Sequence, residues 1–236
     1  MHRTINPAIL YFGTPVVLVS SLNEDGSPNL APMSSAWWLG TRCLLGFGAR
    51  SKTPQNILRT GECVLNLPSA DLAGMVDRLA LTTASDPVPD FKLSRGYHHE
   101  PDKFGVSGFT PVRSDFVRSP RALECPVHLE ATLKHTHPIA AEDESLRGRL
   151  VCLEVEIERV HIEAGILLHG QDDRIDPDKW RPLIMCFQHF YGLGPRLHDS
   201  KLASIPESAY RIAKPAPQPE TVISMEQADS LRMATD

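Results

Sequence analysis

The chain has 236 residues, of which 42% are hydrophobic and 22% are charged, so it is long and apolar enough to fold around a core of its own. Its 24 Lys and Arg against 29 Asp and Glu give a formal net charge of -5, which argues against a nucleic acid partner. No apolar run approaches the roughly 20 residues of a membrane-spanning helix, and no basic segment followed by an apolar one opens the chain. We therefore expect a cytoplasmic protein that binds neither nucleic acid nor a membrane.

Extended segments dominate the first part of the chain. Residues 14–22 form a β-branched run, residues 23–26 (Asn-Glu-Asp-Gly) have the composition of a turn, and residues 27–39 are a second extended segment. Together they predict a β-hairpin. Residues 42–49 predict a third strand, and two glycines within it indicate a bulge or a close approach by another part of the chain.

A short helix is expected after the third strand. Thr53 offers an N-cap oxygen, Pro54 suits the first helical position, and Gly61 can end the helix after about two turns. Residues 62–67 then predict another strand, and Ser69 is placed to cap a second helix.

The second half of the chain is also strand-rich. Residues 85–119 carry several Pro and Gly residues but too many aromatic side chains for a linker, so we expect an ordered and functional loop region. Residues 122–135 are extended, residues 153–158 alternate apolar side chains with glutamates, and two short apolar runs follow at 166–169 and 183–190.

The connections between strands favour an antiparallel sheet. Most are short turns rather than helices of βαβ length, so we expect a mainly β fold with a few short helices, built as a closed or partly closed antiparallel barrel. The barrel domain is expected at 1–205. Residues 206–236 are rich in Pro, Ala and Gln and predict a C-terminal tail or arm.

An anion site is the sharpest local prediction. Residues 48–56 place Arg50, Ser51, Lys52 and Thr53 where a strand meets a helix N-terminus. Free N–H groups and the helix dipole favour an anion there, the two hydroxyls add donors, and the two cations add charge. A single phosphate group would fit. The alternative is a capped surface helix with two solvated cations.

The segment 29–38 is suited to the edge of a planar ring. Its backbone and the Ser34 and Ser35 hydroxyls could bond the polar rim of a heteroaromatic, while Met33 or Trp37 packs against the ring. Alternatively, the two tryptophans of this segment belong to a core or to a subunit interface.

Three blocks in this order resemble a known family. They are residues 26–35 (GSPNLAPMSS), 50–57 (RSKTPQNI) and 60–66 (TGECVLN). Residues 107–111 and 123–130 look like the middle segment of that family, and Phe190-Tyr191-Gly192 like its end. The chain thus resembles, over roughly residues 7 to 200, the flavin reductase-like family of FMN-binding split barrels.

The resemblance implies a homodimer of antiparallel split β-barrels with one FMN per subunit at the dimer interface. Matching the family motifs places Ser34 to Trp37 against the isoalloxazine and assigns the phosphate loop to residues 50–56, with Lys103 and Tyr191 as looser matches. The residues expected to bind the cofactor are Asn29, Met33, Ser34, Ser35, Ala36, Trp37, Arg50, Ser51, Lys52, Thr53, Asn56, Lys103 and Tyr191.

The implied activity is an FMN-dependent oxidoreductase in which NADH or NADPH reduces the flavin and electrons pass to an acceptor or a redox partner protein. Nicotinamide-using reductases of the family often carry Gly-Asp-His before the late strand, whereas this chain has Leu146-Arg147-Gly148, which leaves the electron donor open. Two alternatives remain. One is a flavoredoxin-like electron carrier without turnover, and the other is a split barrel that binds a different planar or phosphate-bearing ligand.

The remaining histidines and cysteines predict little chemistry. His189 could donate a proton near the flavin, or it could be a surface or packing histidine. His135 and His137 would share one face of a strand, but we expect no metal site. The five cysteines are scattered, without a C-x-x-C pair, and predict buried free thiols.

Overall fold

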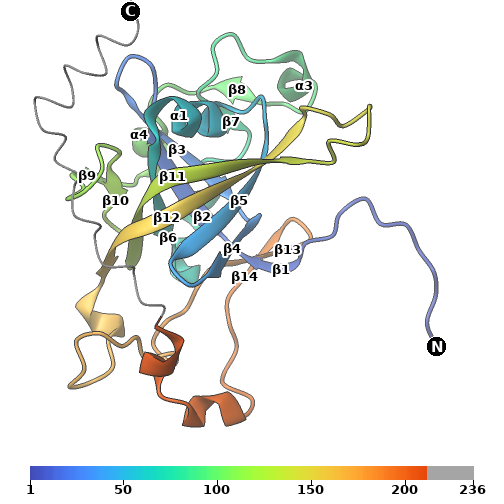
Figure 1. The fold of residues 1–236 in the computed structure, drawn as a ribbon. Coiled ribbons are helices and arrows are strands. Elements are labelled where there is room, and N and C mark those ends of the chain that lie inside the picture. Colours follow the sequence, from blue (N-terminus) through green and yellow to red (C-terminus); the bar gives the residue numbers. More distant parts are fainter. Residues whose placement is uncertain (212–236) are drawn as a thin grey trace, which may run out of the picture. The chain divides into compact units, whose positions relative to one another are not determined.

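The computed structural model describes residues 1–211 (Figure 1). The chain divides into two compact units, Met1–Ser200 and Lys201–Asp236. Within its described residues the second unit holds two 3₁₀ turns, Lys201–Ser204 and Glu207–Tyr210. Most of the tail expected at 206–236 lies outside the described residues, so the proposed boundary after residue 205 stays a prediction.

The first unit is organised by an antiparallel sheet of seven strands in the order β3-β2-β6-β11-β12-β5-β4 (Figure 1). Its two edge strands, β3 and β4, follow each other in the chain and are separated by Ser34 and Ser35. They do not pair with each other in the described part of the chain, so the barrel is split. The strands are β2 (Val17–Leu22), β3 (Pro28–Met33), β4 (Ala36–Leu39), β5 (Arg42–Gly48), β6 (Glu62–Leu67), β11 (Val127–Ile139) and β12 (Leu150–Ile162).

The break between β3 and β4 differs from the continuous strand expected over 27–39. At this break the backbone N–H of Gly46 donates to the Ser35 carbonyl at 2.8 Å. A Cβ at Gly46 would lie 3.2 Å from the Ser35 Cβ, tighter than ordinary packing. Gly46 is therefore the close approach that the glycines of this strand predicted.

Shorter elements surround the barrel. The run expected over 14–22 is divided, because β1 (Phe12–Pro15) leaves the main sheet and joins β13 (Ile184–Cys186) and β14 (His189–Tyr191) in a small sheet of order β1-β13-β14. The region 85–119 is ordered, as expected. The elements around it are α2 (Ala73–Asp77), β7 (Thr82–Thr83), α3 (Asp90–Leu93), β8 (His98–His99), α4 (Lys103–Ser107), β9 (Pro111–Val112) and β10 (Arg121–Ala122).

The helix after the third strand, α1 (Lys52–Thr60), begins two residues earlier than expected. Ser51 is its N-cap, so the assignment of that role to Thr53 is wrong: Thr53 already has helical neighbours and lies inside the first turn. Its end was expected correctly. Gly61 adopts φ 75°, and its N–H donates to the Ile57 carbonyl at 2.8 Å.

Strand β2 separates two apolar clusters. Val17 and Val19 belong to the barrel interior, whereas Leu18, on the opposite face, packs in a second cluster with residues such as Leu79 and Phe104. Both clusters are buried, so the helical segments after β6 are held against the outside of the barrel. The fold is mainly β with few short helices, as predicted.

The thiols are free. Cys43, Cys63 and Cys125 are buried, and burial raises the pKa of Cys43 to about 12, so these residues act as small apolar side chains. In the part of the chain that the structure describes, every helix is too short or too polar to cross a membrane.

Candidate functional site

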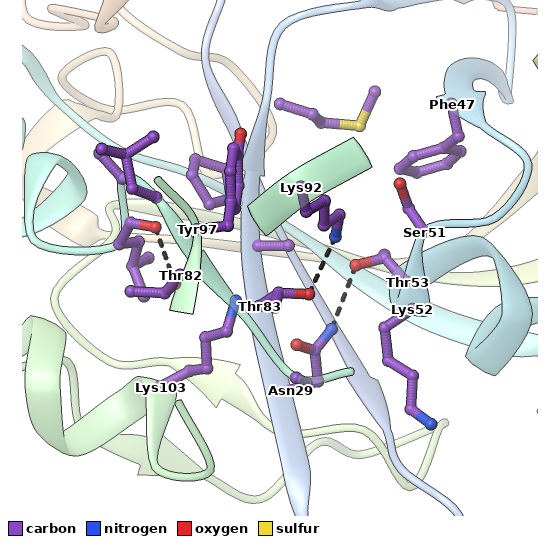
Figure 2. Close-up of a pocket in the computed structure, with 17 residues that line it drawn as sticks. Asn29, Phe47, Ser51, Lys52, Thr53, Thr82, Thr83, Lys92, Tyr97 and Lys103 are labelled. Carbon is purple, nitrogen blue, oxygen red and sulfur yellow. Dashed lines mark hydrogen bonds between the residues drawn. The ribbon is translucent and has the colours of Figure 1, made fainter. Parts of the chain in front are cut away.

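A pocket of about 200 Å³ lies between the barrel and the segments that follow β6 (Figure 2). One wall comes from β3 and the first turn of α1, and the other from residues 79–84, α3 and the start of α4. Its polar and aromatic lining consists of Asn29, Phe47, Ser51, Lys52, Thr53, Thr82, Thr83, Lys92, Tyr97 and Lys103. No carboxylate of the described residues lines it, so the pocket favours an anion.

Lys103 is the most unusual residue of the pocket. It is only 3% exposed, at the start of α4, and its ammonium has no hydrogen bond or ion pair with any residue in 1–211. Burial, helped by the nearby Lys92, lowers the pKa of Lys103 to about 8. A buried cation without a partner is unfavourable, so Lys103 is suited to receive an anionic group from outside the chain.

Lys92 supplies a second cation from α3. Its Nζ donates to the Thr83 Oγ1 at 2.9 Å and lies 5.5 Å from the centre of the Tyr97 ring. Burial also lowers the pKa of Lys92. Lys92 and Lys103 thus place two cations on the same wall, with Thr83 beside them.

The opposite wall presents hydroxyl groups. Thr53 is 5% exposed, and its Oγ1 accepts a hydrogen bond from the Asn29 Nδ2 at 3.1 Å. Ser51 lines the same wall and makes no side-chain capping bond to the helix. The first N–H groups of α1 therefore lie near two hydroxyls and can be satisfied by a bound anion.

The two cations expected to hold the anion are engaged elsewhere. The Lys52 Nζ lies 2.6 Å from a carboxylate oxygen of Glu24, and in Figure 2 its ammonium points away from Lys92 and Lys103. Arg50 lies over the Phe91 ring at 4.8 Å and does not line the pocket. The pocket's unpaired positive charge therefore comes from the region 85–119 instead.

The structure brings part of the expected site together. Six of the expected residues line the pocket: Asn29, Met33, Ser51, Lys52, Thr53 and Lys103. Asn56 lies beneath them, fully buried, with its Nδ2 donating to the Ser21 Oγ at 3.2 Å and to the Asn23 Oδ1 at 2.9 Å. The remaining expected residues do not line it: Ser34, Ser35, Ala36, Trp37, Arg50, His189 and Tyr191.

The residues expected at the ring lie around the break between β3 and β4. The Ser35 Oγ and the Tyr11 hydroxyl are 2.9 Å apart, which ties this break to the residue before β1. Trp37 on edge strand β4 is 52% exposed, whereas its neighbour Trp38 packs against the barrel core. His189 and Tyr191 are exposed on β14.

Sequence reasoning missed Lys92 and Thr83. Both belong to short elements without periodicity, so no local pattern marked them. The only available signal was the aromatic content of the region 85–119, which indicated an ordered loop; this region contains Lys92 and Lys103, whereas Thr83 lies just before it.

A second polar cluster contains Asp115, Glu130 and His161, the one group in residues 1–211 with metal-ligand geometry. Glu130 is fully buried and accepts N–H bonds from Asp115, Phe116 and Val117 at 2.9, 2.5 and 3.0 Å. The His161 Nε2 lies 2.6 Å from it. Burial raises the pKa of Glu130, but these hydrogen bonds outweigh burial and leave it lowered. The carboxylate is already saturated with donors, so the cluster acts as a structural clasp.

The fold is thus a split barrel with a pocket beside the N-terminus of α1. A family model described as flavin reductase like domain matches residues 9–194, and the chain belongs to that family. It is 38% identical over 192 residues to the uncharacterized protein YdfE of Bacillus subtilis (strain 168), covering 81% of this chain and 89% of that one.

Two solved structures share the fold. One is the flavoredoxin of Desulfovibrio vulgaris (Miyazaki F), with a TM-score of 0.68 and 21% identity, covering 86% of this chain and 99% of that one. The other is nitrilotriacetate monooxygenase component B from Bacillus cereus, with a TM-score of 0.66 and 18% identity, covering 84% and 98%. These two structures confirm the split-barrel fold, and the family model over residues 9–194 confirms the resemblance to the flavin reductase-like family.

Proposed function

We propose that the chain is an FMN-binding oxidoreductase, and that the phosphate of FMN occupies the pocket between α1 and α4. The buried, unpartnered ammonium of Lys103 carries this proposal, because it needs an anion that the described residues do not provide. Ser51, Thr53 and the first N–H groups of α1 would hold the phosphate from the barrel side. Lys103 and Lys92 would neutralise it from the other side.

The isoalloxazine would lie outside this pocket. A volume of about 200 Å³ is below the range of about 300 to 1,000 Å³ that holds a drug-sized ligand, so the pocket takes the phosphate end only. Met33 lines the pocket at the end of β3 and leads directly into Ser34 and Ser35. The ring is then placed along the β3–β4 break, where backbone groups and the two serine hydroxyls can bond its polar rim.

A second copy of the chain would complete the ring site. Trp37 and Leu39 on edge strand β4 are 52% and 70% exposed, and Tyr191 on β14 is 55% exposed. Exposed aromatic and aliphatic side chains beside an unpaired strand are suited to a subunit interface. We therefore assign Trp37 and Tyr191 to a homodimer interface that borders the flavin, whereas Ala36 on the same strand is buried in the barrel core.

Bound FMN would supply hydride chemistry, accepting electrons from NADH or NADPH and passing them to an acceptor or a redox partner protein. The chain's own residues would anchor the phosphate and orient the ring. His189, exposed on β14, is proposed as a proton donor at the ring edge. The mechanism needs no resident metal.

Flavin titration tests the proposal directly. Purified protein freed of flavin should quench FMN fluorescence saturably, whereas riboflavin, which lacks the phosphate, should bind at least about tenfold more weakly. Anaerobic stopped-flow mixing with NADH and with NADPH should then bleach the bound FMN with one donor faster than the other. Absence of any FMN binding would exclude the proposed function.

A second candidate is a flavoredoxin-like electron carrier. The chain has Leu146-Arg147-Gly148 where nicotinamide-using relatives often have Gly-Asp-His, which favours a donor other than a nicotinamide. FMN that binds tightly but is bleached by neither NADH nor NADPH would select this candidate.

A further inference from the structure

The hydrogen bonds around Thr83 determine where its proton points. Thr83 is 2% exposed and lines the pocket. Its Oγ1 accepts from the Lys92 Nζ at 2.9 Å and from the Ser85 backbone N–H at 3.3 Å. An ammonium and a peptide N–H can only donate, so both acceptor positions of the hydroxyl are filled. Its single proton is therefore left for another acceptor, and within residues 1–211 it is donated to no group.

The neighbouring Thr82 makes the opposite arrangement. Its hydroxyl donates to the Leu79 carbonyl at 2.8 Å, so its proton is already used inside the segment. Thr82 is nearly as buried as Thr83, at 6% exposed. These two adjacent threonines both line the pocket, but the hydroxyl proton of Thr83 is left for another acceptor, whereas that of Thr82 is donated to Leu79.

Thr53, on the opposite wall, also accepts a hydrogen bond, but from one donor rather than two. Its Oγ1 accepts from the Asn29 amide nitrogen. In Figure 2 the Asn29 oxygen lies on the side of Lys103, which is the stable orientation, because a flipped amide would turn its N–H groups toward the lysine cations. Two threonine hydroxyls on facing walls are thus presented as donors.

We propose that Thr83 is a ligand-binding residue of the pocket, donating its hydroxyl proton to the phosphate, and that Lys92 is a positioning residue that fixes this orientation. The inference rests on the proposed FMN site and adds to it a specificity device. A phosphate oxygen without a proton accepts from Thr83, whereas a hydroxyl-terminated ligand such as riboflavin gains little, since it brings no charge to the two lysines.

The test is a set of fluorescence titrations of the full chain with FMN and with riboflavin. Thr83→Val keeps the side-chain shape and should weaken FMN binding about tenfold while leaving riboflavin binding unchanged. Thr83→Ser restores a hydroxyl and should recover most of the loss. Thr82→Val is the matched control and should keep the FMN-to-riboflavin affinity ratio of the wild type. Should Thr83→Val not fold, Thr83→Ala replaces it.

Lys92→Met tests the positioning role. The effect of Thr83→Val on FMN binding should be at least about threefold smaller in the Lys92→Met background than in the wild type, because a freely rotating hydroxyl no longer points at the phosphate. Equal effects in both backgrounds would overturn the role of Lys92. An unchanged FMN-to-riboflavin ratio in Thr83→Val would overturn the role of Thr83. If the wild type binds no FMN, the proposed function itself fails, and this inference with it.

Discussion

Lys103 and Glu130 both carry a buried charge, but they differ in how many hydrogen-bond partners the chain provides. Glu130 accepts three backbone N–H bonds and a fourth from His161, which pins residues 115–117 to β11. The Lys103 ammonium makes no hydrogen bond and no ion pair with the described residues. A charge satisfied by its own chain is structural, whereas a charge left unsatisfied destabilises the free protein and is retained where a ligand compensates it. By this criterion Glu130 belongs to the structural clasp and Lys103 belongs to the candidate binding pocket.

The largest effect is expected at the clasp. Glu130→Gln replaces an acceptor-only group by an amide that turns N–H groups toward N–H donors, so the free energy of unfolding should fall by about 3 to 5 kcal/mol. Urea unfolding followed by tryptophan fluorescence measures the loss. Glu124→Gln is the control: Glu124 also accepts a backbone N–H, from Thr110 at 2.9 Å, but near the surface, and should lose under about 1 kcal/mol. Equal losses would contradict the structural role of Glu130.

Lys103→Met should act in the opposite direction on stability. Methionine keeps the apolar stem and removes the buried charge, so the free energy of unfolding should stay level or rise at pH 7. FMN affinity should fall by about 1.5 to 3 kcal/mol, which is roughly tenfold to a hundredfold. The same urea experiment and an FMN titration measure both. A destabilised variant with unchanged affinity would place Lys103 with Glu130, as part of the structure.

Stability and FMN affinity should depend on pH in opposite directions because of Lys103. The pKa of Lys103 is lowered to about 8 in the folded chain, from 10.5. Between these values the unfolded state binds more protons, so the contribution of Lys103 to stability should increase as pH rises from 8 toward 10.5. FMN affinity should decrease over the same interval, by up to about tenfold by pH 9, because the neutral amine no longer pairs with phosphate.

Other charged residues near Lys103 also affect its pKa and the pH dependence of FMN binding. Lys92 lowers its pKa and Glu100 raises it, and Lys52 lines the same pocket. Lys103→Met is therefore the control, and both opposing pH slopes should be reduced in it. FMN binding that is as pH-dependent in Lys103→Met as in the wild type would assign the titration to another group.

The smallest effect on FMN affinity is expected from breaking the ion pair between Lys52 and Glu24. Its partner Glu24 is exposed, and the ion pair holds the ammonium away from the two pocket lysines. Glu24→Gln should free Lys52 and tighten FMN binding by about twofold to threefold, in line with the modest strength of surface ion pairs. Asp25→Asn, at the neighbouring exposed acid, should leave the affinity unchanged. Weaker binding in Glu24→Gln would show that the pair positions Lys52 for the ligand.

The fold could largely be predicted because local patterns marked it. The strand at 62–67, the turn at 23–26 and the terminator Gly61 each depend on neighbouring residues, and each was expected correctly, whereas the run at 14–22 is divided between β1 and β2. The break between β3 and β4 could not be predicted, since it depends on contact between Ser35 and Gly46. The orientations of Trp37 and Trp38 also could not be predicted from the local sequence. Adjacent strand residues face opposite sides, and no local signal says which side is the core.

Only some of the residues expected at the site line the pocket, and their role in binding stays a prediction. Ser51, Thr53 and Asn29 follow from the helix N-terminus and the family resemblance, and they line the pocket. Lys92 and Thr83 could not be found, because their role depends on packing a non-periodic region against the barrel. The cations of residues 50–56 were expected to face the ligand, but Phe91 and Glu24 engage them across the chain.

The two walls of the pocket come from different parts of the chain. Strands β6 and β11 are directly paired, Leu67 opposite Val127, so residues 68–126 leave the barrel and return to it at one place. That excursion carries Thr83, Lys92 and Lys103, while Asn29, Ser51 and Thr53 come from the barrel and α1. An insertion with adjoining ends can be exchanged without disturbing strand register. Relatives could thus acquire a new ligand preference through changes within residues 68–126, provided that the side chains packed against Leu18 and the segment held by Glu130 are kept.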